Sequence, residues 1–262
     1  MIAPARMAAF RALRAVIQRS VALPDSLYSV RADVPDRRDR ALLNEIVTGT
    51  LRWLNALDYL IVHFADRPLL KLDPVVRDVL RISIYQLLHL DRVPPSAVVN
   101  DAVNITRTEG PSRAAGLTNA VLRALLRALP HLPSPDEPQE SELAAVSEVQ
   151  FSDWPTHLRQ RALQFISISH SHPDWLVERW LTRYGYSATL AWTKFNNEPA
   201  SVTLRANTLH TTSAALVSRF RENSIVAEPL RYGPDGLSIA SGNQFLPDLT
   251  SSRDFFVQAE AS

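Results

Sequence analysis

The segment RDRALLNEIVTGTLRWLNALDYLIVHF, residues 38–64, decides the fold. Its apolar side chains recur every three or four positions, the pattern of one amphipathic helix or of two helices that meet near Asn55. The apolar stripe consists of Leu42, Leu43, Ile46, Val47, Thr50, Leu51 and Leu54. A half-buried strand would alternate between apolar and polar residues, and this segment does not. A helical domain is therefore predicted around it.

The sequence on both sides of this segment predicts further helices. Asp73 followed by Pro74 is typical of a helix start, because aspartate caps the first turn and proline fits within it. Gly110 ends one later helix. The predicted helices cover residues 7–20, 75–90, 97–108 and 112–129. We therefore expect a mainly α protein with an all-helical domain over residues 1–130.

The sequence changes character after the helical domain. Residues 131–156 are rich in proline and acidic side chains, which predicts a linker. Residues 157–198 predict a helical connector. Residues 199–262 change from a helical to an alternating pattern and predict the order strand, helix, strand, strand, strand. That order is typical of a small α+β domain of the RNA-recognition type.

Composition excludes several classes of function. The chain has 262 residues and no cysteine, so these residues form no disulfide, thiolate metal site or cysteine nucleophile. No apolar run is long enough to cross a membrane, and Arg6, Arg11 and Arg14 interrupt the amino-terminal segment. We expect a cytoplasmic protein that binds no metal. Seven glycines and no phosphate-binding or nucleophile motif give no sign of a nucleotide site.

Charge is distributed unevenly along the chain. Residues 1–130 hold 18 Lys+Arg and 12 Asp+Glu, whereas residues 131–262 hold 10 and 15. The cations are almost all arginine, whose planar guanidinium suits bidentate contact with phosphate or carboxylate. A genome that prefers arginine codons explains the choice of arginine over lysine. It does not explain the basic first half, which favours an anionic partner.

Basic residues near the amino terminus are candidates for RNA binding. They are Arg6, Arg11, Arg14, Arg19, Arg37, Arg38 and Arg40. A structural alternative applies to residues 36–40, because Asp36 or Asp39 can cap a helix while the arginines are simply solvated. The two interpretations are compatible, since a helix start can also present its arginines to phosphates.

For the aromatic residues and two histidines, a structural role is favoured over a role in binding. The rings expected in the core, with base stacking as the alternative, are Trp53, Tyr59, Tyr85, Trp175, Trp180 and Trp192. His170 and His172 are spaced like metal ligands, but no third ligand lies nearby in the sequence. We therefore expect these histidines to belong to a turn before a helix.

The helical segment resembles the NusB family, an all-helical RNA-binding fold. The resemblance rests on four motifs: V-x-G-T-x-R, L-R-x-x-x-Y-Q-L, x-P-x-x-A-V and V-N-x-V-L-R. Their matched positions are Val47, Gly49, Thr50, Arg52, Leu80, Arg81, Tyr85, Gln86, Leu87, Pro95, Ala97, Val98, Asn119, Val121, Leu122 and Arg123. Asp101 stands where glutamate is commoner, and Thr118 where valine is usual.

The rest of the chain resembles the RsmB, or Sun/Fmu, family of ribosomal RNA cytosine-5 methyltransferases. In that family a connecting region leads into a Rossmann-like catalytic domain. The matched positions are His172, Pro173, Trp175, Leu176, Asn196, Asn197, Leu204, Arg205, Asn207, Val257, Gln258, Glu260, Ala261 and Ser262. Ala259 stands where aspartate is usual.

The resemblance implies that this chain is the amino-terminal, RNA-binding part of such an enzyme. It implies 16S ribosomal RNA as partner and S-adenosyl-L-methionine as cofactor of the intact enzyme, whose cysteines activate the cytosine. With no cysteine and no cofactor-binding turn, we expect neither catalytic nor cofactor-binding residues in this chain, which is predicted to be inactive alone. Arg123 and Arg205, which lie in matched motifs, complete the RNA-binding candidates.

Two alternatives remain open from the sequence. One is a NusB-like factor that acts in transcription antitermination or ribosome assembly without catalysis, in which case the helical domain also contacts proteins. The other is a helical scaffold with no role in RNA binding. The methyltransferase interpretation accounts for the whole order of motifs, and the other two do not.

Overall fold

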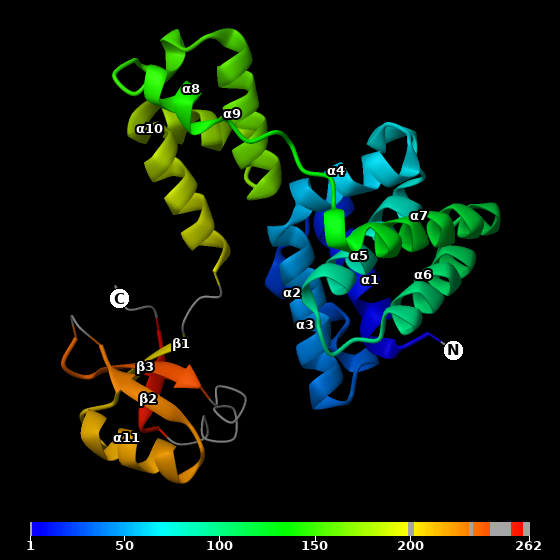
Figure 1. Ribbon diagram of the computed structural model, residues 1–262. Helices are drawn as coiled ribbons and strands as arrows, with labels where there is room; N and C mark the ends of the chain where they lie inside the picture. The colour runs from blue at the N-terminus through cyan, green and yellow to red at the C-terminus, as the bar shows by residue number, and fades with distance from the viewer. Residues whose placement is uncertain (1, 199–201, 231–232, 242–252, 259–262) are drawn as a thin grey trace. The chain divides into compact units, whose positions relative to one another are not determined.

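The computed structural model describes residues 2–198, 202–230, 233–241 and 253–258. The chain divides into two compact units, Met1–Asn197 and Glu198–Ser262. The first unit is helical, and the second is a small α+β domain (Figure 1). The expected mainly α fold class is therefore confirmed.

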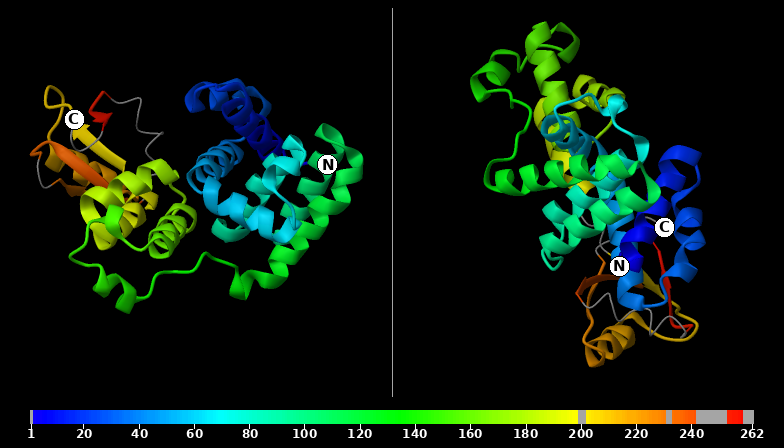
Figure 2. Two further views of the ribbon diagram at one scale, coloured as in Figure 1. Left: turned by 90° about the horizontal axis from the view of Figure 1, so that it is seen from above. Right: turned by 90° about the vertical axis from the view of Figure 1, so that its right-hand side faces the viewer.

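The first unit begins with seven α-helices that gather around one hydrophobic core (Figures 1 and 2). Their bounds are α1 Pro4–Arg19, α2 Leu23–Ser29, α3 Arg37–Arg52, α4 Leu54–Ala65, α5 Pro74–His89, α6 Pro95–Glu109 and α7 Ala115–Ala128. Short 3-10 turns lie between them at η1 Arg31–Asp33, η2 Leu69–Lys71 and η3 Ser112–Ala114. Helix α5 lies at the centre of the core, with ten of its residues buried.

Local sequence explains where these helices begin and end. Asp36 caps α3 by accepting from the backbone N–H groups of Arg38 and Asp39. Asp73 caps α5 in the same way, with Pro74 in its first turn. The segment 38–64 forms two helices, and the break lies at Trp53, close to the predicted junction at Asn55.

The remaining helices of the first unit form a second core. After η4 Leu129–His131 come α8 Glu140–Ala145, η5 Phe151–Asp153, α9 Thr156–Ser169 and α10 Asp174–Asn197. Val146, Phe151 and Trp154 are buried in this core. The prediction of a linker was wrong for these three residues, because their apolar side chains pack against α9 and α10. Within the described residues, no helix is long and apolar enough to cross a membrane.

One asparagine joins the helical domain to the connector. The backbone N–H of Asn55 donates to the hydroxyl of Ser171 (2.9 Å). Its side-chain amide donates to the carbonyl oxygens of His172 (2.9 Å) and Ser167 (3.4 Å). These bonds cross more than 110 positions of sequence, so Asn55 holds α4 against the turn between α9 and α10.

Among its described residues, the second unit forms a four-stranded antiparallel sheet and one helix, and the predicted order of strand, helix, strand, strand, strand is confirmed. Its elements are β1 Val202–Ala206, α11 Ser213–Glu222, β2 Val226–Pro229, β3 Gly236–Ser241 and β4 Phe255–Val257, and the strand order is β2-β3-β1-β4. Leu204, Leu216 and Phe220 are fully or almost fully buried between sheet and helix. The matched positions from Ala259 to Ser262 lie outside the described residues.

Candidate nucleic-acid interface

Arg6 does not belong to the interface. Its Nη1 lies 2.6 Å from Oδ2 of Asp101, and its Nε donates to Oε1 of Gln86 at 2.8 Å. The residue is 8% exposed. The prediction that Arg6 contacts phosphate was therefore wrong, because an arginine inside the core is already paired with a carboxylate. Gln86 and Asp101 are the residues that hold it there.

Three of the predicted arginines come together. Arg11, Arg14 and Arg19 line one pocket of about 470 Å³ beside α2 and the end of α6. Arg11 is exposed, and its contacts with Asp33 (3.4 Å) and Glu109 (3.7 Å) are long. Such exposed pairs contribute little, so Arg11 remains available to an anionic ligand.

Arg14 is half-buried in the same pocket. Its guanidinium carbon lies 5.5 Å from the ring centre of Phe10, a cation–π contact. One terminal nitrogen, Nη1, is buried and has no hydrogen-bond partner among the described residues. A guanidinium N–H without a partner is a donor for which a phosphate oxygen is a suitable acceptor.

The start of α3 presents a second basic group. Arg37 and Arg38 are exposed and Arg40 is half-buried. The backbone N–H groups of Asp39 and Arg38, together with the charges of Arg38 and Arg40, lower the pKa of the Asp36 carboxyl. Asp36 is therefore the helix cap, as one interpretation expected. Because α1 packs against α3, this group and the Arg11 pocket belong to the same domain.

The last two predicted arginines lie elsewhere. Arg123 is exposed on α7, where its Nε donates to Oδ1 of Asn119 at 3.0 Å. Arg205 is exposed on β1, opposite Phe256 of β4. Phe256 is 55% exposed, so the second unit presents a guanidinium beside an aromatic ring. The sequence pattern pointed to Arg205 but carried no signal for Phe256, because the pairing of β1 with β4 places them opposite each other.

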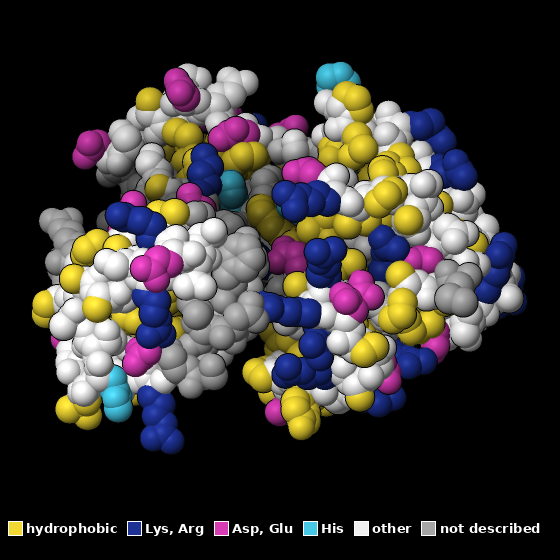
Figure 3. Space-filling model, turned by 90° about the horizontal axis from the view of Figure 1, so that it is seen from below, with side chains coloured by type: hydrophobic (Ala, Val, Ile, Leu, Met, Phe, Trp, Pro, Cys, Tyr) yellow, Lys and Arg dark blue, Asp and Glu magenta, His cyan; other side chains and the backbone are white. Residues whose placement is uncertain are grey.

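The charged surface is mixed. Figure 3 shows Lys and Arg side chains spread over the helical domain, at the right of the view, with acidic side chains between them. A dispersed set of cations suits contact with a phosphate backbone at several points. Contacts of this kind fix the position of a nucleic acid more than they recognise its sequence.

Two tryptophans contradict the expectation of a core position. Trp175 is 65% and Trp192 is 49% exposed. Helix α10 contains a kink at Gly185, and each half buries only one face. Trp192 stacks on the exposed ring of Phe195 at 5.8 Å and meets Trp180 edge to face at 6.5 Å. Exposed rings of this kind suit the alternative interpretation, base stacking.

The two histidines shape a turn, as expected. A ring nitrogen of His172 lies 2.6 Å from the carbonyl oxygen of His170, which also accepts from the Asn197 side chain at 2.7 Å. Burial lowers the pKa of both imidazoles. No group of three or more potential metal ligands occurs among the described residues.

Two family models match this chain. Residues 3–127 match the NusB family, and residues 172–245 match the Methyltr_RsmF/B-like ferredoxin-like domain. The whole chain superimposes on the solved structure of PH0851 with a TM-score of 0.61 and 18% identity, covering 54% of that chain. This similarity supports the fold.

Curated relatives extend across both units. The "Probable ribosomal RNA small subunit methyltransferase B" of Bacillus subtilis is 27% identical over 226 residues, 86% of this chain and 45% of the relative. The protein of that name from Synechocystis sp. is 28% identical, over 90% of this chain and 48% of the relative. The chain spans about half the length of these relatives. It therefore joins a NusB-family domain to an RsmF/B-type ferredoxin-like domain and is related over most of its length to ribosomal RNA small subunit methyltransferase B.

Proposed function

We propose that this chain is the RNA-binding part of an S-adenosyl-L-methionine-dependent enzyme that methylates cytosine C5 in 16S ribosomal RNA. The observation that supports this best is the presence of both domain matches in one chain. A free-standing NusB-like factor would leave residues 172–245 unexplained. The substrate implies a cytoplasmic location.

The two matched domains have different proposed roles. Residues 1–130 bind the RNA through its phosphates, and residues 199–262 connect this RNA-binding domain to the catalytic domain. The described sheet is antiparallel throughout, so it lacks the parallel strand, glycine turn and helix that bind a nucleotide cofactor. S-adenosyl-L-methionine would supply the methyl group, and no described residue is proposed to hold it.

A genetic experiment tests the methyltransferase proposal. Bisulfite sequencing of small-subunit ribosomal RNA from a strain without the gene should show the loss of one 5-methylcytosine. Codons 1–262 alone should not restore it, because they encode no cysteine to activate the base. An unchanged methylation pattern in the deletion strain would leave the catalytic role unsupported.

The phosphate-binding role of α1 has its own prediction. Arg11→Ala combined with Arg14→Ala should weaken binding to all structured RNAs alike. It should also reduce the slope of log K against log salt by about 1.4 to 1.8, since each lost phosphate contact removes about 0.7 to 0.9. Filter-binding titrations at several salt concentrations measure both effects.

A matched variant controls for net charge. Arg92→Ala with Arg127→Ala also removes two arginines; both are exposed, and neither lines the Arg11 pocket. We expect this control to change the salt slope by less than half as much. Equal slopes for the two double variants would reject a localised phosphate site on α1.

A further inference from the structure

Two exposed aromatic rings lie side by side near the end of α10. Trp192 is 49% and Phe195 is 63% exposed, and their ring planes are inclined by 29° at a centre-to-centre distance of 5.8 Å. Residues three positions apart are neighbours on a helix surface, so the two rings form one continuous surface, the α10 aromatic pair. A single exposed ring needs no explanation, whereas two exposed rings in contact indicate a binding surface.

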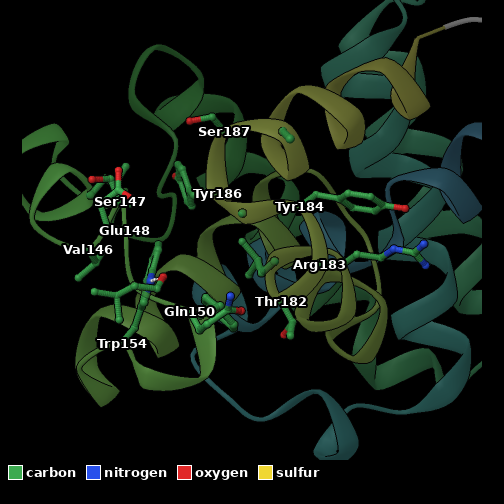
Figure 4. Close-up of a pocket in the computed structure, with 16 residues that line it drawn as sticks. Val146, Ser147, Glu148, Gln150, Trp154, Thr182, Arg183, Tyr184, Tyr186 and Ser187 are labelled. Atoms are coloured by element: carbon green, nitrogen blue, oxygen red, sulfur yellow. Dashed lines mark hydrogen bonds between the residues drawn. The ribbon is translucent and has the colours of Figure 1, made fainter.

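The kink of α10 decides which of its rings are buried. Gly185 interrupts the helix with φ of 74° and ψ of 179°. Directly after it, Tyr186 packs with Trp154 in the second core, and Figure 4 shows it on that side of the helix. Thr189 and Thr193 continue this buried face. The α10 aromatic pair lies outside the buried face, so its rings are left to solvent.

Small neighbours leave the faces of these rings open. Helical side chains lean toward the amino terminus of their helix, so each ring lies over the turn before it. The residues four positions earlier are Ala188 for Trp192 and Ala191 for Phe195, and an alanine cannot cover a ring. The half-buried Trp180 meets Trp192 edge to face at 6.5 Å and supports it. The pair is therefore held in place while its ring faces stay accessible.

Charge and size favour a nucleic acid over a protein as the ligand of this surface. Residues 186–197 contain one cation, the exposed Lys194, and no acidic residue, which suits a phosphate backbone. Two aromatic side chains bury at most about 500 Å² when they are fully covered. Each partner of a stable protein interface contributes about 800 Å². The pair is thus too small for a protein interface but large enough for stacked bases.

We propose that the α10 aromatic pair stacks unpaired bases of the bound RNA, with Lys194 on the adjoining phosphates. Every base has an aromatic face, so this stacking tolerates any sequence and requires only that the base is unpaired. The inference rests on the proposed function, because that function supplies the RNA. It adds a contact that depends on base exposure, in contrast to the phosphate contacts of the Arg11 pocket.

Three RNAs separate base stacking from phosphate contact. One is a blunt hairpin, the second carries an unpaired cytidine tail, and the third carries an abasic tail of the same length. The chain of residues 1–262 should bind the cytidine tail at least about fivefold more tightly than the abasic tail, the lower value for one stacked base. Trp192→Leu combined with Phe195→Leu should remove this preference, because leucine keeps an apolar surface but has no aromatic face.

Two further variants serve as controls. Phe195→Tyr keeps an aromatic face and should keep the preference for the cytidine tail. Tyr28→Leu removes a 77% exposed ring from α2 and should keep it as well. Circular dichroism should show the same helix content in all variants, since every replaced side chain is exposed.

The outcomes distinguish this inference from its alternatives. Equal binding of the cytidine and abasic tails by the wild type would overturn it, and so would a preference that survives in the double leucine variant. Wild-type dimers in sedimentation that Trp192→Ala with Phe195→Ala converts to monomers would assign the pair to a second copy of this chain. Failure of the wild type to bind the blunt hairpin would instead count against the proposed function, whose phosphate contacts need no unpaired base.

Discussion

Gly49→Ala is expected to destabilise the helical domain by about 3 kcal/mol, the upper range for overpacking a core. A Cβ at this position would lie 1.9 Å from Cζ and 2.0 Å from Oη of Tyr85. The ring cannot move aside easily, because Tyr85 is 4% exposed and its hydroxyl donates to Glu45 at 2.5 Å. Urea unfolding followed by circular dichroism measures the loss.

The loss of stability expected for Gly49→Ala is opposite to the usual effect of replacing a helical glycine with alanine. Alanine is favoured over glycine inside a helix by about 1 kcal/mol. Gly116, in α7, provides the matched control, because a Cβ there would meet nothing within 4 Å. Gly116→Ala should be neutral or stabilising by up to about 1 kcal/mol.

A double variant identifies the cause. Tyr85→Ala is destabilising alone, but the addition of Gly49→Ala should then cost little, because the ring that it meets is gone. The coupling between the two substitutions should be at least about 2 kcal/mol in a double-mutant cycle. Additive losses would show that the contact between Gly49 and Tyr85 does not explain the requirement for glycine.

The sequence predicted the helices well because their signals are local. Asp36 and Asp73 cap the helices that they precede, and the apolar stripe of residues 38–64 is buried or partly buried, as its spacing indicated. The order of strands and helix after residue 198 also followed from periodicity. Sequence could identify Gly49 and Tyr85 as motif positions, but their contact joins two helices and has no local signal.

The errors arose where tertiary packing decides. Val146 and Phe151 follow a proline-rich stretch that indicates a linker, yet both are buried because α9 and α10 offer them an apolar surface. Trp175 and Trp192 have helical spacing and apolar rings, yet they lie off the buried stripe of α10. Periodicity shows that a face exists and does not show which side chains a neighbouring helix covers.

The sequence predicted that arginines would form the candidate site, but not which of these arginines are exposed and which are paired within the protein. An excess of arginine in the first half pointed to an anionic partner, and Arg11, Arg14 and Arg19 do line one pocket. The same reasoning included Arg6, since charge counts do not distinguish a solvated arginine from a buried one. The partner of Arg6, Asp101, lies 95 positions away.

Arg6 and Arg11 should differ strongly in their contribution to the stability of the domain. Arg6→Met should destabilise the domain by about 3 to 5 kcal/mol, because it leaves a buried carboxylate on Asp101 without its cation. Arg6→Met combined with Asp101→Leu should recover most of that loss, since a buried ion pair can be replaced by apolar residues at little cost. Arg11→Met, at an exposed position, should change stability by less than about 0.5 kcal/mol.

RNA binding should show the reverse pattern: the loss of Arg11 should lower RNA affinity, and the loss of Arg6 should not. Measured per folded molecule, the Arg6→Met and Asp101→Leu double variant should retain wild-type RNA affinity and salt slope, because Arg6 contacts protein and not solvent. Arg11→Met should lower both, since it removes a cation from the pocket on α1. Chemical denaturation and filter binding on the same preparations provide the comparison. A fall in RNA affinity for the stable double variant would return Arg6 to the residues that contact phosphate.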